Sequence, residues 1–89
     1  MDMKFNSVEE LYKRVYPALT AKKNELHRLG YNYIKQQDIW NYLRDSKWKN
    51  SKGLTLSEMV DNILNCENKK IDYYIKEQLR NKVGEKHEN

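Results

Sequence analysis

The chain has little of several residue types that mark whole classes of protein. Its 89 residues include one cysteine, three glycines and one proline. The lone Cys66 can form neither an internal disulfide nor a cysteine-based zinc site, so side-chain packing must supply the stability. So little glycine and proline excludes collagen-like and Pro/Gly-rich disordered chains. No apolar run approaches the roughly 18 residues of a membrane span, so we expect no membrane insertion.

Catalytic and metal-binding arrangements are missing as well. His27 and His87 lie far apart in the sequence, and the glycines are isolated, so neither a zinc site nor a phosphate-binding loop is indicated. Asp38 and Asp45 are typical of solvated helix acids rather than an acid–base pair. We therefore expect a non-enzymatic protein with no catalytic residues, no metal and no cofactor. The N-terminus lacks the apolar stretch of a signal peptide, which predicts a cytoplasmic location.

Charge is what the chain has in abundance. Charged residues make up 34% of the sequence against 38% hydrophobic residues, and the net charge is +4. Residues 12–52 hold ten basic and three acidic side chains, whereas residues 53–89 hold six basic and seven acidic ones. Because Lys and Arg bind phosphates and release counterions, the middle segment is typical of a nucleic-acid-binding surface. The candidate phosphate contacts are Lys22, Lys23, Arg28, Lys47, Lys49 and Lys52.

Hydrophobic periodicity predicts helices almost throughout. One apolar stripe stays in phase over residues 8–29, after a capping box in which Ser7 and Glu10 satisfy each other's amides. Gly30 supplies the positive φ that commonly ends a helix. Pro17 lies within the stripe and removes one amide donor, so we predict that the first helix is kinked or broken there.

Three shorter helical segments follow. Ile34 and Ile39 are placed as a hydrophobic staple around Lys35 as N-cap, which predicts a helix over about residues 36–45. A polar loop over residues 45–53 leads to a second capping box from Thr55 to Glu58 and a strongly amphipathic helix. A narrower apolar stripe runs through residues 71–79. These patterns predict an all-α, single-domain bundle of four to five helices, with a flexible segment 1–6, a helical domain 7–83 and a disordered tail 84–89.

Trp48 lies between two of the candidate phosphate contacts. An indole flanked by Lys47 and Lys49 is typical of a residue that stacks on an unpaired base while its neighbours bind phosphates. The alternative is that Trp48 closes the small core and the lysines keep the loop hydrated. Sequence alone leaves both hypotheses open.

Tyrosine is the most abundant aromatic residue. Seven tyrosines exceed what so small a core can bury, and tyrosine is enriched at protein interfaces. A groove between the first and last helices would suit an amphipathic helix of a partner, while half-buried rings with hydrated hydroxyls and self-association are the alternatives. The candidate partner-binding residues are Tyr16, Tyr31, Tyr33, Tyr42 and Tyr73.

Five segments also occur in a recognisable order. They are Tyr16-Pro17-Ala18-Leu19, Leu26-His27-Arg28-Leu29-Gly30-Tyr31, Asp38-Ile39-Trp40-Asn41-Tyr42-Leu43, Lys47-Trp48-Lys49 and Met59-Val60-Asp61-Asn62-Ile63-Leu64. In this order the chain resembles the ComN-like post-transcriptional regulators of Gram-positive bacteria. The resemblance implies a cytoplasmic, non-enzymatic regulator that acts at the level of messenger RNA. Two mechanisms are compatible with it: direct RNA binding through the basic surface, or a protein adaptor that uses exposed tyrosines.

Overall fold

The computed structural model describes residues 2–3 and 8–87, and four α-helices make up most of that part. The helices are α1 (Val8–Arg28), α2 (Gln36–Ser46), α3 (Leu56–Asn65) and α4 (Asn68–His87). Between α2 and α3 lie a 3₁₀ turn η1 (Trp48–Asn50) and the strand β2 (Lys52–Leu54), which pairs in parallel with β1 (Asp2–Met3). The predicted all-α class is confirmed. The strand pair escaped prediction because two or three residues carry no periodic signal.

Helix α1 passes through its proline without interruption. Pro17 lies inside the helix, and the flanking Val15 and Leu19 are fully buried on its inner side. Burial of this apolar face keeps the helix continuous although one amide donor is missing. The predicted break is therefore wrong, whereas the kink stays a prediction. Ser7, the predicted N-cap, lies outside the described residues.

Gly30 ends α1 as predicted. Its φ is +102°, a conformation that favours glycine. The amide of Gly30 donates to the carbonyl of His27 at 3.1 Å, and the amide of Tyr31 donates to that of Leu26 at 2.9 Å, the hydrogen-bond pair of a Schellman motif. The His27 ring holds the following loop through a 2.7 Å hydrogen bond between Nε2 and the Ile34 carbonyl.

The two predicted helix starts in the middle of the chain are confirmed. Helix α2 begins after Lys35, whose backbone amide donates to the Asp38 carboxylate at 2.9 Å. Helix α3 begins after Thr55, whose hydroxyl accepts from the Glu58 amide at 3.1 Å while the Glu58 carboxylate accepts from the Thr55 amide. Both caps are local in sequence, so the pattern alone could predict them.

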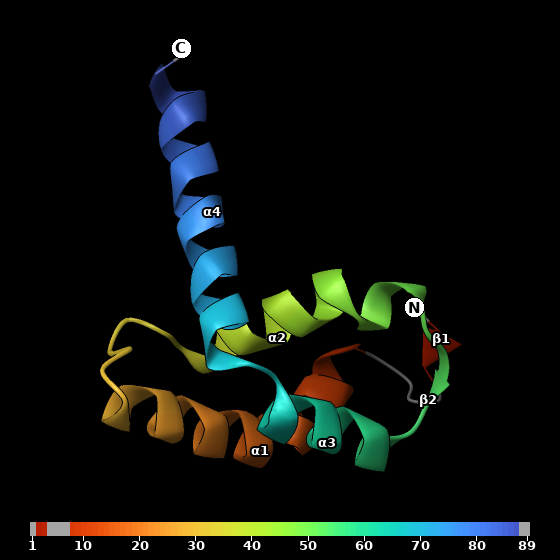
Figure 1. The fold of residues 1–89 in the computed structure, drawn as a ribbon. Coiled ribbons are helices and arrows are strands. Elements are labelled where there is room, and N and C mark those ends of the chain that lie inside the picture. Colours follow the sequence, from red (N-terminus) through yellow and green to blue (C-terminus); the bar gives the residue numbers. More distant parts are fainter. Residues whose placement is uncertain (1, 4–7, 88–89) are drawn as a thin grey trace.

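The helices pack as a layered body with one projecting helix (Figure 1). Helices α1 and α3 lie side by side, α2 packs against both of them, and α4 leaves the body beyond the end of α3 and contacts α2 near its base. No helix in the described residues is long and apolar enough to cross a membrane. The core comprises Leu11, Val15, Leu19, Leu26, Ile34, Ile39, Trp40, Leu43, Trp48, Leu54, Met59, Ile63, Ile71 and Ile75.

The chain ends were predicted as a flexible segment 1–6 and a tail 84–89. Asp2 and Met3 form strand β1, and residues 1 and 4–6 lie outside the described part. Helix α4 continues to His87, so it extends into the predicted tail, of which residues 88–89 also lie outside the described part.

Candidate functional site

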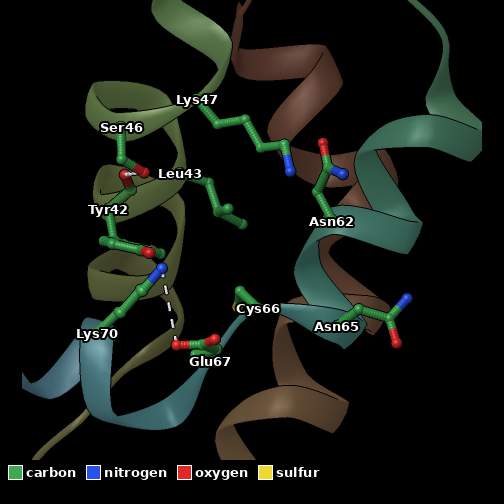
Figure 2. A pocket seen from close by; sticks show the side chains of 9 residues that line it. All are labelled: Tyr42, Leu43, Ser46, Lys47, Asn62, Asn65, Cys66, Glu67 and Lys70. Carbon is green, nitrogen blue, oxygen red and sulfur yellow. Dashed lines mark hydrogen bonds and ion pairs between the residues drawn. The ribbon is translucent and has the colours of Figure 1, made fainter.

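The ends of α2 and α3 and the start of α4 meet around a hollow of about 610 Å³ (Figure 2). Lys47, the residue that follows α2, extends across it toward Asn62 of α3. Tyr42 of α2 and Lys70 of α4 form the opposite side, and Cys66 lies between the two walls. The hollow therefore combines two ammonium groups, two amides, a carboxylate and an aromatic ring.

The polar groups of this hollow are held in place but not all are paired. The Asn62 Oδ1 accepts a 2.8 Å hydrogen bond from the Trp48 Nε1–H. The NH₂ group of Asn62 has no hydrogen-bond partner among the described residues. The Lys47 ammonium forms no ion pair within the described part of the chain. Lys70 pairs with Glu67 at 3.7 Å, but both side chains are exposed, so the pair contributes little.

A second hollow, of about 380 Å³, continues the first one between α2 and α4. Tyr42 and Lys70 line both hollows, and Lys69 and Tyr73 extend the lining along α4. Tyr73 is 66% exposed, so most of its ring is open to solvent. We call Lys47, Lys69, Lys70, Tyr42 and Tyr73 together the lysine–tyrosine surface.

Contacts between α2 and α4 fix the shape of this surface. The Tyr74 hydroxyl donates to the Asp45 carboxylate at 2.6 Å, and the rings of Tyr74 and Tyr42 meet edge to face at 5.7 Å. The hydrogen bond from Arg44, together with that from Tyr74, lowers the pKa of Asp45 below its usual range. Burial, with the Asp45 bond, raises the pKa of Tyr74 to about 12. At neutral pH the pair is therefore a neutral phenol donating to a carboxylate.

A third hollow, of about 670 Å³, lies between α1 and the α3–α4 junction. We call it the Lys22 hollow, because Lys22 of α1 lines it with a side chain that is 4% exposed. It shares Asn65, Cys66 and Glu67 with the first hollow. Burial raises the pKa of the Cys66 thiol, so the sulfur stays protonated and is no nucleophile. No group of His, Cys, Asp and Glu side chains in the described residues could hold a metal ion.

Comparisons with known proteins place the sequence in a family. The sequence profile described as "Post-transcriptional regulator" matches residues 8–87. The chain belongs to this family. It is also 39% identical over 59 residues to the post-transcriptional regulator ComN of Bacillus subtilis (strain 168), a match that covers 65% of this chain and 60% of the relative. The chain thus spans less than two thirds of that relative's length, and no solved structure matches it.

In this family member, two of the residues predicted to contact RNA from the surface are buried. Trp48 has no exposed area, meets Trp40 edge to face at 5.4 Å and donates its indole N–H to Asn62. It offers no open ring face to a base, so the core alternative is the correct one. Lys22 is buried because it falls on the apolar face of α1, so it is no outer phosphate contact.

Of the remaining predicted phosphate contacts, only Lys47 lines a hollow described above. Lys47 is exposed and lines the first hollow. Lys49 is exposed in η1, whereas Lys23 is half-buried and Arg28 exposed on α1, and none of these three lines any of the hollows described above. The side chain of Lys52 lies outside the described part.

The candidate tyrosines also divide by position. Tyr42 and Tyr73 share the hollow between α2 and α4, whereas the Lys22 hollow, which residues of the first and last helices both line, contains neither of them. Tyr31 lines the Lys22 hollow. Tyr16 is exposed and contacts Tyr12, and the exposed Tyr33 donates a hydrogen bond to Asp72.

Sequence reasoning missed the α4 part of this family member's surface. Lys69 and Lys70 directly precede the buried Ile71, and Tyr73 follows one turn after Lys69. The sequence pattern that could have indicated this surface is the pair Lys69-Lys70 one helical turn before Tyr73. Averaging charge over residues 53–89, where acids outnumber bases by one, concealed it.

Proposed function

We propose that this post-transcriptional regulator binds single-stranded RNA on the lysine–tyrosine surface, as a non-enzymatic protein of the cytoplasm. One observation carries the proposal: three lysines, one directly after α2 and two on α4, line two adjoining hollows that share Tyr42 and Lys70. Phosphate-binding cations beside an open aromatic face are the combination that proteins use on unpaired strands.

Each part of the surface has a distinct role in this proposal. Lys47, Lys69 and Lys70 bind the phosphates, because among the described residues these three cations outnumber the two acids that line the hollows, Glu67 and Glu77. The open ring of Tyr73 stacks on a base. The unpartnered NH₂ group of Asn62 donates to a base edge in the first hollow. Asn65, whose NH₂ group already donates to the Asp61 carbonyl at 2.9 Å, adds its second N–H. The apolar second hollow receives the face of a base or ribose.

The proposal is tested by fluorescence anisotropy with a labelled single-stranded RNA at several salt concentrations. Replacing Lys69 and Lys70 together with Ala removes two phosphate contacts. The slope of log affinity against log salt should then become shallower by about 1.4, since a single strand loses roughly 0.7 per contact. Tyr73→Ala should weaken binding by about 1–3 kcal/mol, the value of one base–aromatic stack.

The control is a double variant with the same change in net charge. Lys13 and Lys35 are exposed and line none of the hollows described above, so replacing both with Ala should leave the salt slope close to that of the parent. Equal losses in the two double variants would reduce the effect to general electrostatics and contradict the proposed surface. Salt-independent binding would contradict phosphate recognition itself.

A second candidate function is suggested by exposed apolar side chains on α4. Leu79 is 57% exposed and Tyr73 is 66% exposed on the same helix, and exposed apolar residues on a helix are the anchors by which helices bind partners. Leu79→Asp should leave RNA affinity intact. If that variant loses regulation in cells while the Lys69/Lys70 variant retains it, the protein is an adaptor rather than an RNA-binding protein.

A further inference from the structure

The Lys22 hollow contains a buried cation without a full partner. Lys22 is the only charged residue in the buried class among the described side chains. Its Nζ lies 3.6 Å from Glu25 Oε2, beyond the usual range of about 2.7–3.2 Å for a hydrogen bond. A lysine that is merely packed extends its ammonium to water. Here the stem is buried and the residue lines a hollow of about 670 Å³.

Unsatisfied acceptors line the same hollow. Asn68 Oδ1 is buried and has no hydrogen-bond partner among the described residues. Among the described residues, the Glu25 carboxylate, with its side chain 43% exposed, has only the long contact to Lys22. Tyr31, Leu29 and Leu64 add apolar walls. A donor beside acceptors, between apolar walls, fits a planar ligand whose edge carries both acceptor and donor groups.

The nucleobases differ in how well they match this set of groups. A carboxylate binds most strongly when two parallel N–H groups point at its two oxygens. Guanine alone among the four RNA bases presents this pair, N1–H and N2–H, directly beside an acceptor, O6. An ammonium also suits the guanine O6 and N7 acceptors.

We propose that the Lys22 hollow binds an unpaired guanine, with Lys22 donating to O6 and Glu25 accepting from N1–H and N2–H. Asn68 Oδ1 is a further acceptor for the exocyclic amine. This inference rests on the proposed function, because the RNA strand that carries the guanine is bound on the adjoining lysine–tyrosine surface. Asn65, Cys66 and Glu67 line both this hollow and the first one, so a strand on the lysine–tyrosine surface passes directly beside it.

The test compares RNAs that differ at one position. The probes are a labelled 12-nucleotide oligouridine and the same strand with a single central guanine, adenine or inosine. The protein should bind the guanine strand about 5- to 150-fold more tightly than the uridine strand, the range given by one specific bidentate contact. Inosine lacks the N2 amine, so it should retain only part of that preference, and adenine should show none.

Variants connect the preference to the hollow. Glu25→Gln keeps the shape but removes one of the two acceptor oxygens, so the guanine-to-uridine affinity ratio should fall toward one. Lys22→Met should lower the ratio in the same way, with its circular dichroism spectrum checked against the parent. Glu9→Gln is the matched control, since Glu9 is exposed on α1 and lines no part of this hollow. That variant should keep the parent ratio.

The outcomes separate this inference from the function on which it rests. Salt-dependent binding with equal affinity for the guanine and uridine strands would overturn the guanine site and leave RNA binding standing. A preference that survives Glu25→Gln would place guanine recognition elsewhere on the protein. Failure to bind any strand at low salt would overturn both proposals.

Discussion

Trp48 illustrates why the charge of neighbouring residues is a poor guide to exposure. Lys47 and Lys49 are both exposed, whereas the indole between them is fully buried. In a 3₁₀ turn successive side chains point about 120° apart, so one residue can face the core while both neighbours face water. The indole N–H needs a partner once buried, and Asn62 of α3 provides it at 2.8 Å.

Trp48→Phe tests this structural role. The variant loses the hydrogen bond to Asn62, leaves an acceptor unsatisfied and opens a small cavity, so we expect a loss of about 2–3 kcal/mol in the free energy of unfolding. Urea unfolding followed by circular dichroism measures it. Trp40→Phe is the control, because the Trp40 indole is buried but has no hydrogen bond within the described residues, so its loss should be smaller.

The same variant also separates packing from RNA contact. Because the Trp48 ring has no exposed face, Trp48→Phe should bind single-stranded RNA with the affinity of the parent under conditions where both are folded. A large loss of affinity in the folded variant would show that the ring reaches RNA and would contradict its assignment to the core.

At the scale of elements, the predictions that succeeded are those that depend on a few adjacent residues. The Thr55–Glu58 box, the Lys35–Asp38 pair and Gly30 each act within four residues, so the sequence pattern contains the whole interaction. The break predicted at Pro17 does not occur because the burial that keeps α1 continuous comes from other helices. Strand β2 depends on residues about fifty positions away in β1, which no local pattern records.

The hydrogen bond between Tyr74 of α4 and Asp45 of α2 predicts how these elements respond to alkali. Burial and the Asp45 contact raise the pKa of Tyr74 from 10.0 to about 12 in the folded state. A group whose folded pKa is raised stabilises the fold fully below its unfolded pKa. That stability is lost as pH rises through the folded value. The contribution should therefore be complete below about pH 10 and disappear near pH 12.

The measurement is urea unfolding at several pH values between 8 and 12, with phenol ionisation followed by ultraviolet absorbance. Tyr74→Phe should be less stable than the parent at pH 8, and the difference should shrink as pH approaches 12. Comparing the two proteins at each pH cancels the titration of the lysines. A difference that stays constant up to pH 12 would mean that Tyr74 contributes through packing alone.

At the scale of the whole molecule, the candidate site could be predicted only in part. Lys47, Tyr42 and Tyr73 were all candidates from the sequence, but they were assigned to two different surfaces. They form one surface because α4 places Lys69 and Lys70 beside α2, an arrangement that depends on how three helix ends meet. The Lys22 hollow likewise depends on how helices distant in sequence pack together, here α1, α3 and α4.

The packing of α4 against the other helices determines whether the lysine–tyrosine surface is always formed in the folded protein. Ile71 is fully buried and Ile75 nearly so, whereas Leu79 is mostly exposed, so contact with the core is concentrated in the first two turns (Figure 1). These turns also place Lys69 and Lys70. If they fold together with the rest of the molecule, the lysine–tyrosine surface exists before RNA arrives.

Ile71→Ala distinguishes a single cooperative unit from a body with a separately folding helix. Removing a fully buried isoleucine should cost about 2–4 kcal/mol, whereas Leu79→Ala should cost under about 0.5 kcal/mol because that side chain is already in water. Trp40 and Trp48 report on the body, and circular dichroism reports on all helices. In a single unit, Ile71→Ala shifts the urea midpoints of fluorescence and circular dichroism equally. If fluorescence keeps the parent midpoint while helicity is lost earlier, α4 folds separately and the lysine–tyrosine surface forms only when that helix docks.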